Sequence, residues 1–133
     1  MSSKHLDLAN NFNSFAYDLV TNESVAKENL ESLKDDVLFR RIIFSKYYYA
    51  LYHKYLAHDD DLRSKTGSSI HNAILNKVCS CNDPKLHQVF LKLLNLRVWA
   101  DYKVEDDEQA LSVGLKVIAN DVYSIIKRSN INC

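Results

Sequence analysis

The chain has 133 residues, of which 47% are hydrophobic and 26% are charged. This length and hydrophobic content fit one folded domain over residues 1–133 and exclude a disordered chain. The 17 basic residues are balanced by 17 acidic ones, which excludes the broad phosphate neutralisation of strongly basic nucleic-acid-binding proteins. Any contact with nucleic acid must therefore be local or must use a partner's surface.

The sequence offers no sign of a metal site, a secretion signal or a membrane span. Cys79, Cys81 and Cys133 lack the paired spacing of structural zinc sites, and three is an odd number for a disulfide framework. We expect reduced thiols in a cytoplasmic protein, with no metal and no cofactor. The N-terminus has no apolar core of signal-peptide length, and no segment approaches the length of a transmembrane helix.

The first half of the chain predicts three helices. Residues 4–20 carry apolar residues at helical spacing, and residues 23–34 form a shorter and largely polar helix with Asn22 as a plausible cap. Asp35 and Asp36 then stand where acidic residues favour the start of a helix. The third helix covers residues 39–58 and contains four tyrosines within six residues.

This tyrosine-rich helix carries hydroxyl groups on its expected inward face. That face is formed by Leu38, Ile42, Ser45, Tyr49, Tyr52 and Leu56. Arg41 and His53 flank it. Buried polar groups must be hydrogen-bonded, so another part of the chain is expected to provide their partners.

The second half predicts three more helices after a polar connection. Residues 59–67 are interpreted as a solvated loop, with a mobile lid or an RNA-contacting loop through Arg63 and Lys65 as the alternative. Ser68 or Ser69 caps the next helix, which ends near residue 79. The dipeptide at residues 83–84, an acid and then proline, starts a helix that ends near Tyr102.

The last helix is expected to open at residues 106–108 and to form core. Its apolar residues repeat at 3.6-residue spacing, namely Leu111, Leu115, Ile118, Val122 and Ile125. The few turn residues, two glycines and one proline, leave little room for a sheet. The predicted fold is therefore all-α, an antiparallel bundle of about five helices plus a short one.

The helix over residues 84–102 ends in an expected ion pair. Arg97 and Asp101 lie four residues apart on the extension of its apolar stripe, so burial would oblige them to pair. Together with polar groups of other helices they form a candidate ligand-binding site. Its members are Arg41, Ser45, Tyr49, His53, His71, Arg97 and Asp101. The alternative is a satisfied network that only fixes the register of the helices.

Three segments, in order, resemble the HEPN family (higher eukaryotes and prokaryotes nucleotide-binding). The segment from Ser45 to His53, Ser-Lys-Tyr-Tyr-Tyr-Ala-Leu-Tyr-His, resembles the family's signature. The segment at residues 69–74 is similar to the Ser/Thr-His stretch that opens the family's third long helix. Residues 96–102, Leu-Arg-Val-Trp-Ala-Asp-Tyr, match a Leu-Arg-x-x-Ala-Asp-Tyr motif. The resemblance spans about residues 36–126.

The resemblance implies a compact helical bundle that commonly dimerises. It also implies a role centred on nucleotides or RNA, often in prokaryotic defence or toxin–antitoxin systems. Many members are metal-independent ribonucleases with an arginine, four to six residues and then a histidine. Such a pair suits RNA cleavage, because histidine can move a proton and arginine can stabilise the phosphorane charge.

This chain departs from the ribonuclease pattern. No arginine precedes a histidine by the required gap, and the nearest case, Arg63 to His71, has seven intervening residues. If there is a catalytic site, its candidates are His53, His71 and Arg97, brought together across helices or across a dimer.

Three functions remain open at this stage. The chain is a nucleotide- or RNA-binding module of a defence or toxin–antitoxin system, a ribonuclease with a rearranged site, or a structural adaptor subunit. The expected partners are a nucleotide or RNA and either a second copy or another protein of the same system.

Overall fold

The computed structural model describes residues 2–129 and 131, and these residues form helices and no strand. The five longer helices are α1 (Ser3–Thr21), α3 (Asp36–His58), α5 (Ser69–Ser80), α6 (Pro84–Tyr102) and α8 (Leu115–Ile126). The shorter elements are α2 (Glu23–Asn29), the 3-10 helix η1 (Glu31–Lys34), α4 (Asp60–Arg63) and α7 (Glu108–Ser112). The predicted all-α class is therefore confirmed.

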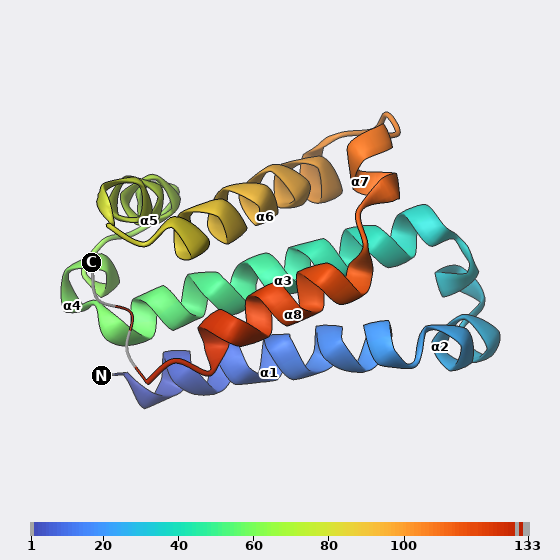
Figure 1. Ribbon diagram of the computed structural model, residues 1–133, viewed down its shortest axis with the longest axis horizontal. Coiled ribbons are helices and arrows are strands. Elements are labelled where there is room, and N and C mark those ends of the chain that lie inside the picture. Colours follow the sequence, from blue (N-terminus) through green and yellow to red (C-terminus); the bar gives the residue numbers. More distant parts are fainter. Residues whose placement is uncertain (1, 130, 132–133) are drawn as a thin grey trace.

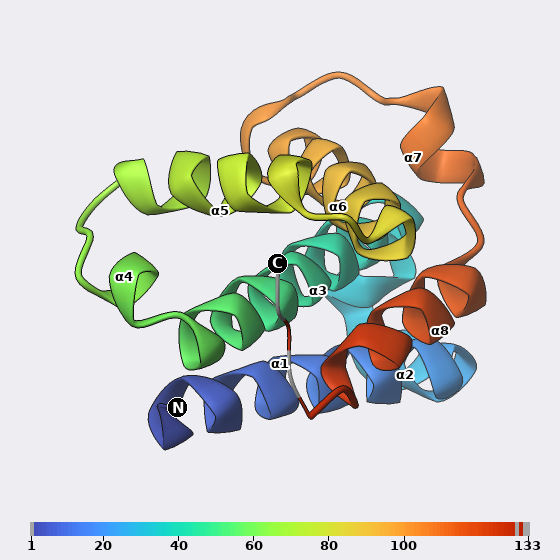
Figure 2. The same ribbon diagram turned by 60° about the vertical axis from the view of Figure 1, so that its left-hand side comes forward.

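Helix α3 lies at the centre of the bundle. It packs against α1, α6 and α8, while α1 also packs against α8 (Figure 1). Helices α1 and α6 run antiparallel to α3, and α8 runs in the same direction as α3. Helix α5 crosses these helices steeply at the end where α6 begins, as the two views together show (Figure 2).

The helix starts follow from acidic caps in the sequence. The carboxylate of Asp35 accepts hydrogen bonds from the backbone N–H groups of Val37 and Leu38, and the carboxylate of Asp83 accepts one from Leu86. Such caps satisfy N–H groups that have no partner within the helix. The predicted starts of α3 and α6 are thus confirmed, whereas Ser68 makes no side-chain cap for α5.

The prediction of the inward face of α3 is wrong for five of its six residues, since only Leu56 is buried. The fully buried side chains of α3 lie on the opposite side of the helix from the predicted face and include Phe39, Ile43, Phe44, Tyr47, Tyr48 and Leu51. On the predicted face, Leu38 is 37% exposed and Ser45 and Tyr49 are half-buried. Because α3 contacts three helices at once, most of its circumference is core and the polar stripe is its partly open side.

Two predicted helices are interrupted. The segment at residues 23–34 divides at Leu30 into α2 and η1, and the last helix divides at Val113 and Gly114 into α7 and α8. Arg40 secures the second break, since its Nη1 atom donates to the carbonyls of Ala110 (3.1 Å) and Val113 (2.7 Å). A long-range contact of this kind leaves no trace in helical periodicity.

The polar connection after α3 is only partly the loop that the sequence predicts. It contains the short helix α4, and Arg63 folds back onto the last turn of α3, where its Nη1 donates to the carbonyl of Ala57 at 2.9 Å. It donates to the carbonyl of Leu56 as well. Arg63 therefore satisfies carbonyls at a helix end.

The cysteines differ from the expectation of reduced thiols. Cys79 is a free, exposed thiol, but Cys81 is disulfide-bonded, so the prediction is wrong for that residue. Sequence spacing does not reveal sulfurs that the fold brings together, and Cys133 lies outside the described residues. Among the described residues no group of three or more metal-ligating side chains occurs. In the same part of the chain, no helix has both the length and the apolarity to cross a membrane.

Small side chains permit the close approach of α1 to α3. Ala9 and Ala16 of α1 and Ala50 of α3 are completely buried. We expect Ala16→Leu to lower the free energy of unfolding by about 1–3 kcal/mol, because extra methylenes in a packed interface force strain. Urea denaturation measures the change, and Asn10→Leu on the exposed side of α1 is the matched control. Equal stability of both variants would contradict this account of the interface.

Candidate functional site

Arg97 is the centre of a polar network between α3 and α6. The residue is 8% exposed, and its Nε donates to Oδ2 of Asp101 at 3.0 Å. Its Nη2 donates to the hydroxyls of Tyr49 at 2.9 Å and Tyr102 at 3.1 Å. The ion pair predicted from the four-residue spacing is present, although the Asp101 side chain is 30% exposed. The pair is thus buried on the arginine side only.

Tyrosine rings surround the same guanidinium. Its Cζ atom lies 5.3 Å from the ring centroid of Tyr48, 5.4 Å from that of Tyr49 and 5.0 Å from that of Tyr102. Cations are attracted to the electron-rich faces of aromatic rings, and more strongly where water is excluded. These contacts compensate part of the cost of burying the Arg97 charge.

His71 joins this cluster from the start of α5. Its Nδ1 lies 2.7 Å from the hydroxyl of Tyr48, and its ring packs at 5.0 Å from that of Tyr52. Burial raises the pKa of Tyr48, so the phenol keeps its proton. Burial, with a smaller effect of the Arg97 charge, lowers the pKa of His71. The imidazole is therefore neutral at pH 7.

Arg41 and Ser45 of α3 lie against the C-terminal end of α6. The Nη1 of Arg41 donates to the carbonyls of Trp99 (2.8 Å) and Ala100 (3.0 Å), and its guanidinium lies 4.2 Å from the Trp99 ring centroid. Ser45 Oγ is 3.5 Å from Oδ2 of Asp101. A cavity of about 260 Å³ opens here. It is lined by Leu38, Arg41, Ile42, Ser45, Lys46, Ala100 and Asp101.

His53 packs against α1 and touches this cluster through the ring of Tyr52, at 5.0 Å between centroids. Its Nδ1 is 2.9 Å from Nδ1 of His5, and its ring stacks on Phe12 at 5.6 Å with an interplanar angle of 14°. In this hydrogen bond one Nδ1 carries the hydrogen and donates it, and the Nδ1 of the other ring is unprotonated and accepts it. Burial, with a smaller effect of His5, lowers the pKa of His53 to about 4.

The predicted site is thus divided between two places. Arg41, Ser45, Tyr49, His71, Arg97 and Asp101 belong to the side of α3 that meets α5 and α6, whereas His53 contacts α1. Helical spacing places Tyr49 and His53 one turn apart on one side of α3. It does not show which neighbouring helix covers each turn.

Sequence reasoning missed two residues of the site. His5 is the partner of His53, and the only signal for it is its place one turn before the apolar residues of α1. Lys46 lines the cavity beside Ser45, and its Nζ lies 5.3 Å from the ring centroid of Phe12. The sequence feature that could have indicated Lys46 is its position next to the half-exposed polar stripe of α3.

Comparisons with protein-family models, with curated proteins and with solved structures each find no match for this chain. The HEPN resemblance therefore depends on its three sequence motifs.

Removal of the guanidinium should destabilise the protein. We expect Arg97→Ala to lower the free energy of unfolding by about 3 kcal/mol, because Asp101 and two tyrosine hydroxyls lose their partner. The double change Arg97→Met with Asp101→Leu should cost less, since it leaves no uncompensated charge. Thermal and urea unfolding measure both variants against Lys103→Ala, an exposed control on the same chain segment. An Arg97→Ala protein as stable as this control would contradict the network.

The histidine pair should make stability depend on pH. The folded-state pKa of His53, about 4, lies below the ordinary value of 6.5, so the unfolded chain takes up a proton first as the pH falls. Stability is then lost between about pH 6.5 and pH 4, by about 2–3 kcal/mol from this residue. We expect His53→Phe, which keeps the stacking on Phe12, to lose less stability across this window. Parallel pH profiles of the two proteins would contradict the burial of a neutral imidazole at this position.

Proposed function

We propose that the protein is a nucleotide- or RNA-binding module of the HEPN type without the standard ribonuclease site, acting in a prokaryotic defence or toxin–antitoxin system. The observation that carries the proposal is the guanidinium of Arg97, held among tyrosines beside an open cavity that other cations line. Guanidinium and ammonium groups are the usual ligands of phosphate in proteins, and tyrosine faces stack on bases.

The cavity beside Asp101 supports a phosphate site. Lys46 takes part in no ion pair among the described residues, so its charge is available to a ligand. The Ser45 hydroxyl and the Arg41 guanidinium line the same cavity. At about 260 Å³ it is smaller than the roughly 300–1,000 Å³ of sites that enclose a whole ligand. It suits one phosphate group.

The base of such a ligand would lie outside the cavity. The side chain of Tyr102 is 65% exposed and adjoins Arg97, so its ring offers a stacking surface next to the phosphate site. Because the net charge of the chain is zero, binding rests on these local groups, and weak affinity is expected.

A second copy or another protein of the same system remains the proposed partner. Val104, at 89% exposure, and Phe15, at 49%, are large apolar side chains left open to solvent. Exposed apolar groups of this kind support a protein contact only where they are contiguous. We propose the partner because the HEPN resemblance implies one.

A ribonuclease with a rearranged site is the second candidate. His71 and Arg97 both contact Tyr48, and the neutral imidazole of His71 fits a general base for a 2′-hydroxyl. His53, the other candidate histidine, pairs with His5 of α1 and makes no contact with Arg97 among the described residues. This candidate predicts metal-independent RNA cleavage that His71→Gln abolishes.

A structural adaptor is the third candidate, and the same network supports it. Arg97 already donates to Asp101, Tyr49 and Tyr102, so the network can be complete without a ligand. In that case its role is to fix the register of α3 against α6.

Titration with AMP and with a short single-stranded RNA, followed by the NMR signals of the histidines, tests the proposal. We expect the His71 signals to shift and those of His53 to stay. Lys46→Ala should weaken binding about two- to fivefold, as expected for one exposed charge contact. Lys116→Ala on the exposed side of α8 is the control, and Arg97→Lys should abolish the shift.

Other outcomes assign the protein to the alternatives. Cleavage of the RNA that is lost in His71→Gln would replace the binding module by the ribonuclease. Unshifted histidine signals at millimolar ligand would favour the structural adaptor over both other functions.

A further inference from the structure

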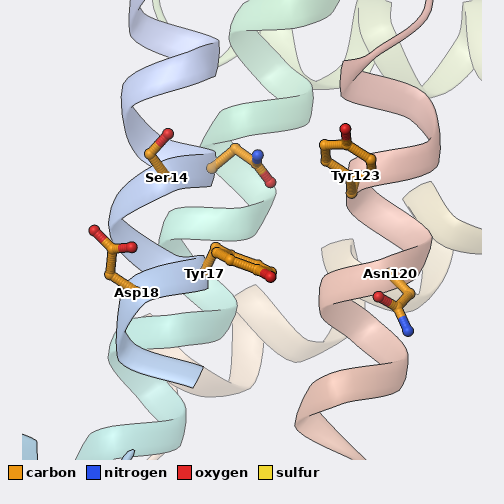
Figure 3. A pocket seen from close by; sticks show the side chains of 6 residues that line it. Ser14, Tyr17, Asp18, Asn120 and Tyr123 are labelled. Carbon is orange, nitrogen blue, oxygen red and sulfur yellow. The ribbon is translucent and has the colours of Figure 1, made fainter. Parts of the chain in front are cut away.

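A separate groove lies between α1 and α8, away from the Arg97 network. Its volume is about 530 Å³, within the range of small-molecule sites. It is lined by Asn13, Ser14, Tyr17, Asp18, Asn120 and Tyr123. Figure 3 shows Tyr17 extending from α1 toward α8, Asn120 and Tyr123 on the opposite wall, and α3 behind the groove. Nothing in the HEPN resemblance draws on these residues.

Three buried side-chain polar atoms have no hydrogen-bond partner among the described residues, and two of them lie on α1 and α3. These two are Oδ1 of Asn13, which lines the groove, and the hydroxyl of Tyr47 on α3, whose side chain is completely buried. Asn13 follows Ala9 by one turn and precedes Ala16 on the side of α1 that packs on α3. A buried acceptor without a donor costs stability, so retaining an amide here calls for a donor from elsewhere.

The walls of the groove present open aromatic faces. Tyr17 is 48% exposed and Tyr123 is 53% exposed. The ring of Tyr123 already has a cation near it, since Nζ of Lys127 lies 5.6 Å from its centroid. Tyrosine faces attract ammonium and guanidinium groups, and two rings on opposite walls resemble the aromatic sites that hold organic cations.

The charge of the groove also favours a cationic ligand. Among the described residues no lysine or arginine lines it, and Asp18 is the one lining residue that carries a charge. Among the described residues, Asp18 takes part in no ion pair. An anionic ligand would meet repulsion from the carboxylate, whereas a cation would gain it and the rings, taking the place of the Lys127 ammonium at Tyr123.

We propose that this groove binds an organic cation that carries a guanidinium or alkylammonium group. Such a group lies against the faces of Tyr17 and Tyr123 and is balanced by Asp18. It donates to Oδ1 of Asn13 after the buried amide turns toward the groove. The cation comes either from an arginine side chain of a peptide or from a free polyamine, which present the same chemistry.

Titration with N-acetylarginine amide tests the proposal, with the uncharged citrulline analogue as the matched control ligand. The readout is the side-chain amide signals of Asn13 and Asn120 in ¹H–¹⁵N NMR spectra. We expect the arginine compound to shift both signals and the citrulline compound to leave them in place. Spermidine in a parallel titration separates the sources, because binding tighter than that of the arginine compound assigns the groove to polyamines.

Variants of the groove provide the second test. Tyr17→Leu and Tyr123→Leu should each weaken binding about two- to fivefold, the share of one exposed cation–ring contact. Asp18→Asn should weaken it similarly. Phe15→Leu removes an exposed aromatic ring of α1 that does not line the groove and should leave this binding unchanged. Asn13→Ala should abolish the response of Asn120 while leaving the melting temperature equal or higher, since the orphaned acceptor is removed.

Three results would overturn the proposal. The first is the absence of any shift at about 10 mM of either cation, which means a binding free energy weaker than about −3 kcal/mol. The second is equal binding of the citrulline compound and the arginine compound. The third is an Asn13→Ala protein that melts at a lower temperature and binds the arginine compound as before. The site is distinct from the cavity beside Asp101, so these results leave the proposed nucleotide binding untouched, and its failure leaves this groove untouched.

Discussion

The burial of α3 on several sides at once is the constraint on which the rest of the structure depends. Helices α1, α6 and α8 pack around it, and six of its large side chains are completely buried. A helix in this position removes more apolar surface from water than a surface helix does. It also leaves every polar group on its circumference in need of a partner from another helix.

Most polar groups of α3 find such a partner, whereas the hydroxyl of Tyr47 and Nε2 of His58 find none among the described residues. Lys54, only 3% exposed, donates to the carbonyl of Arg128 at 2.6 Å, and Arg41 donates to the last carbonyls of α6. The hydroxyl of Tyr48 is matched by His71, and that of Tyr49 by Arg97. The polar groups of α3 thus tie it to α5, to α6 and to the segment after α8. Any ligand at this site must compete with contacts that the fold already uses.

The two candidate sites differ in charge, and this separates their chemistry. The cavity between α3 and α6 is lined by Arg41 and Lys46 and by Asp101, which is paired with Arg97, and phosphate is the ligand that we propose for it. The groove between α1 and α8 has Asp18 and no basic residue, and it is suited to a cation. A chain of zero net charge can hold both kinds of site because its charges are segregated locally rather than in excess.

The sequence by itself determined the helices and their starts, because these depend on local chemistry. Asp35 and Asp83 cap α3 and α6 through backbone groups two or three residues away, and Arg97 pairs with Asp101 within one helix. Only the tertiary structure decided which face of α3 is buried and which helix covers each turn. That is why His53 meets His5 rather than Arg97. It also decided the breaks after Leu30 and at Gly114, since contacts between residues far apart in the chain follow from packing, which no local pattern encodes.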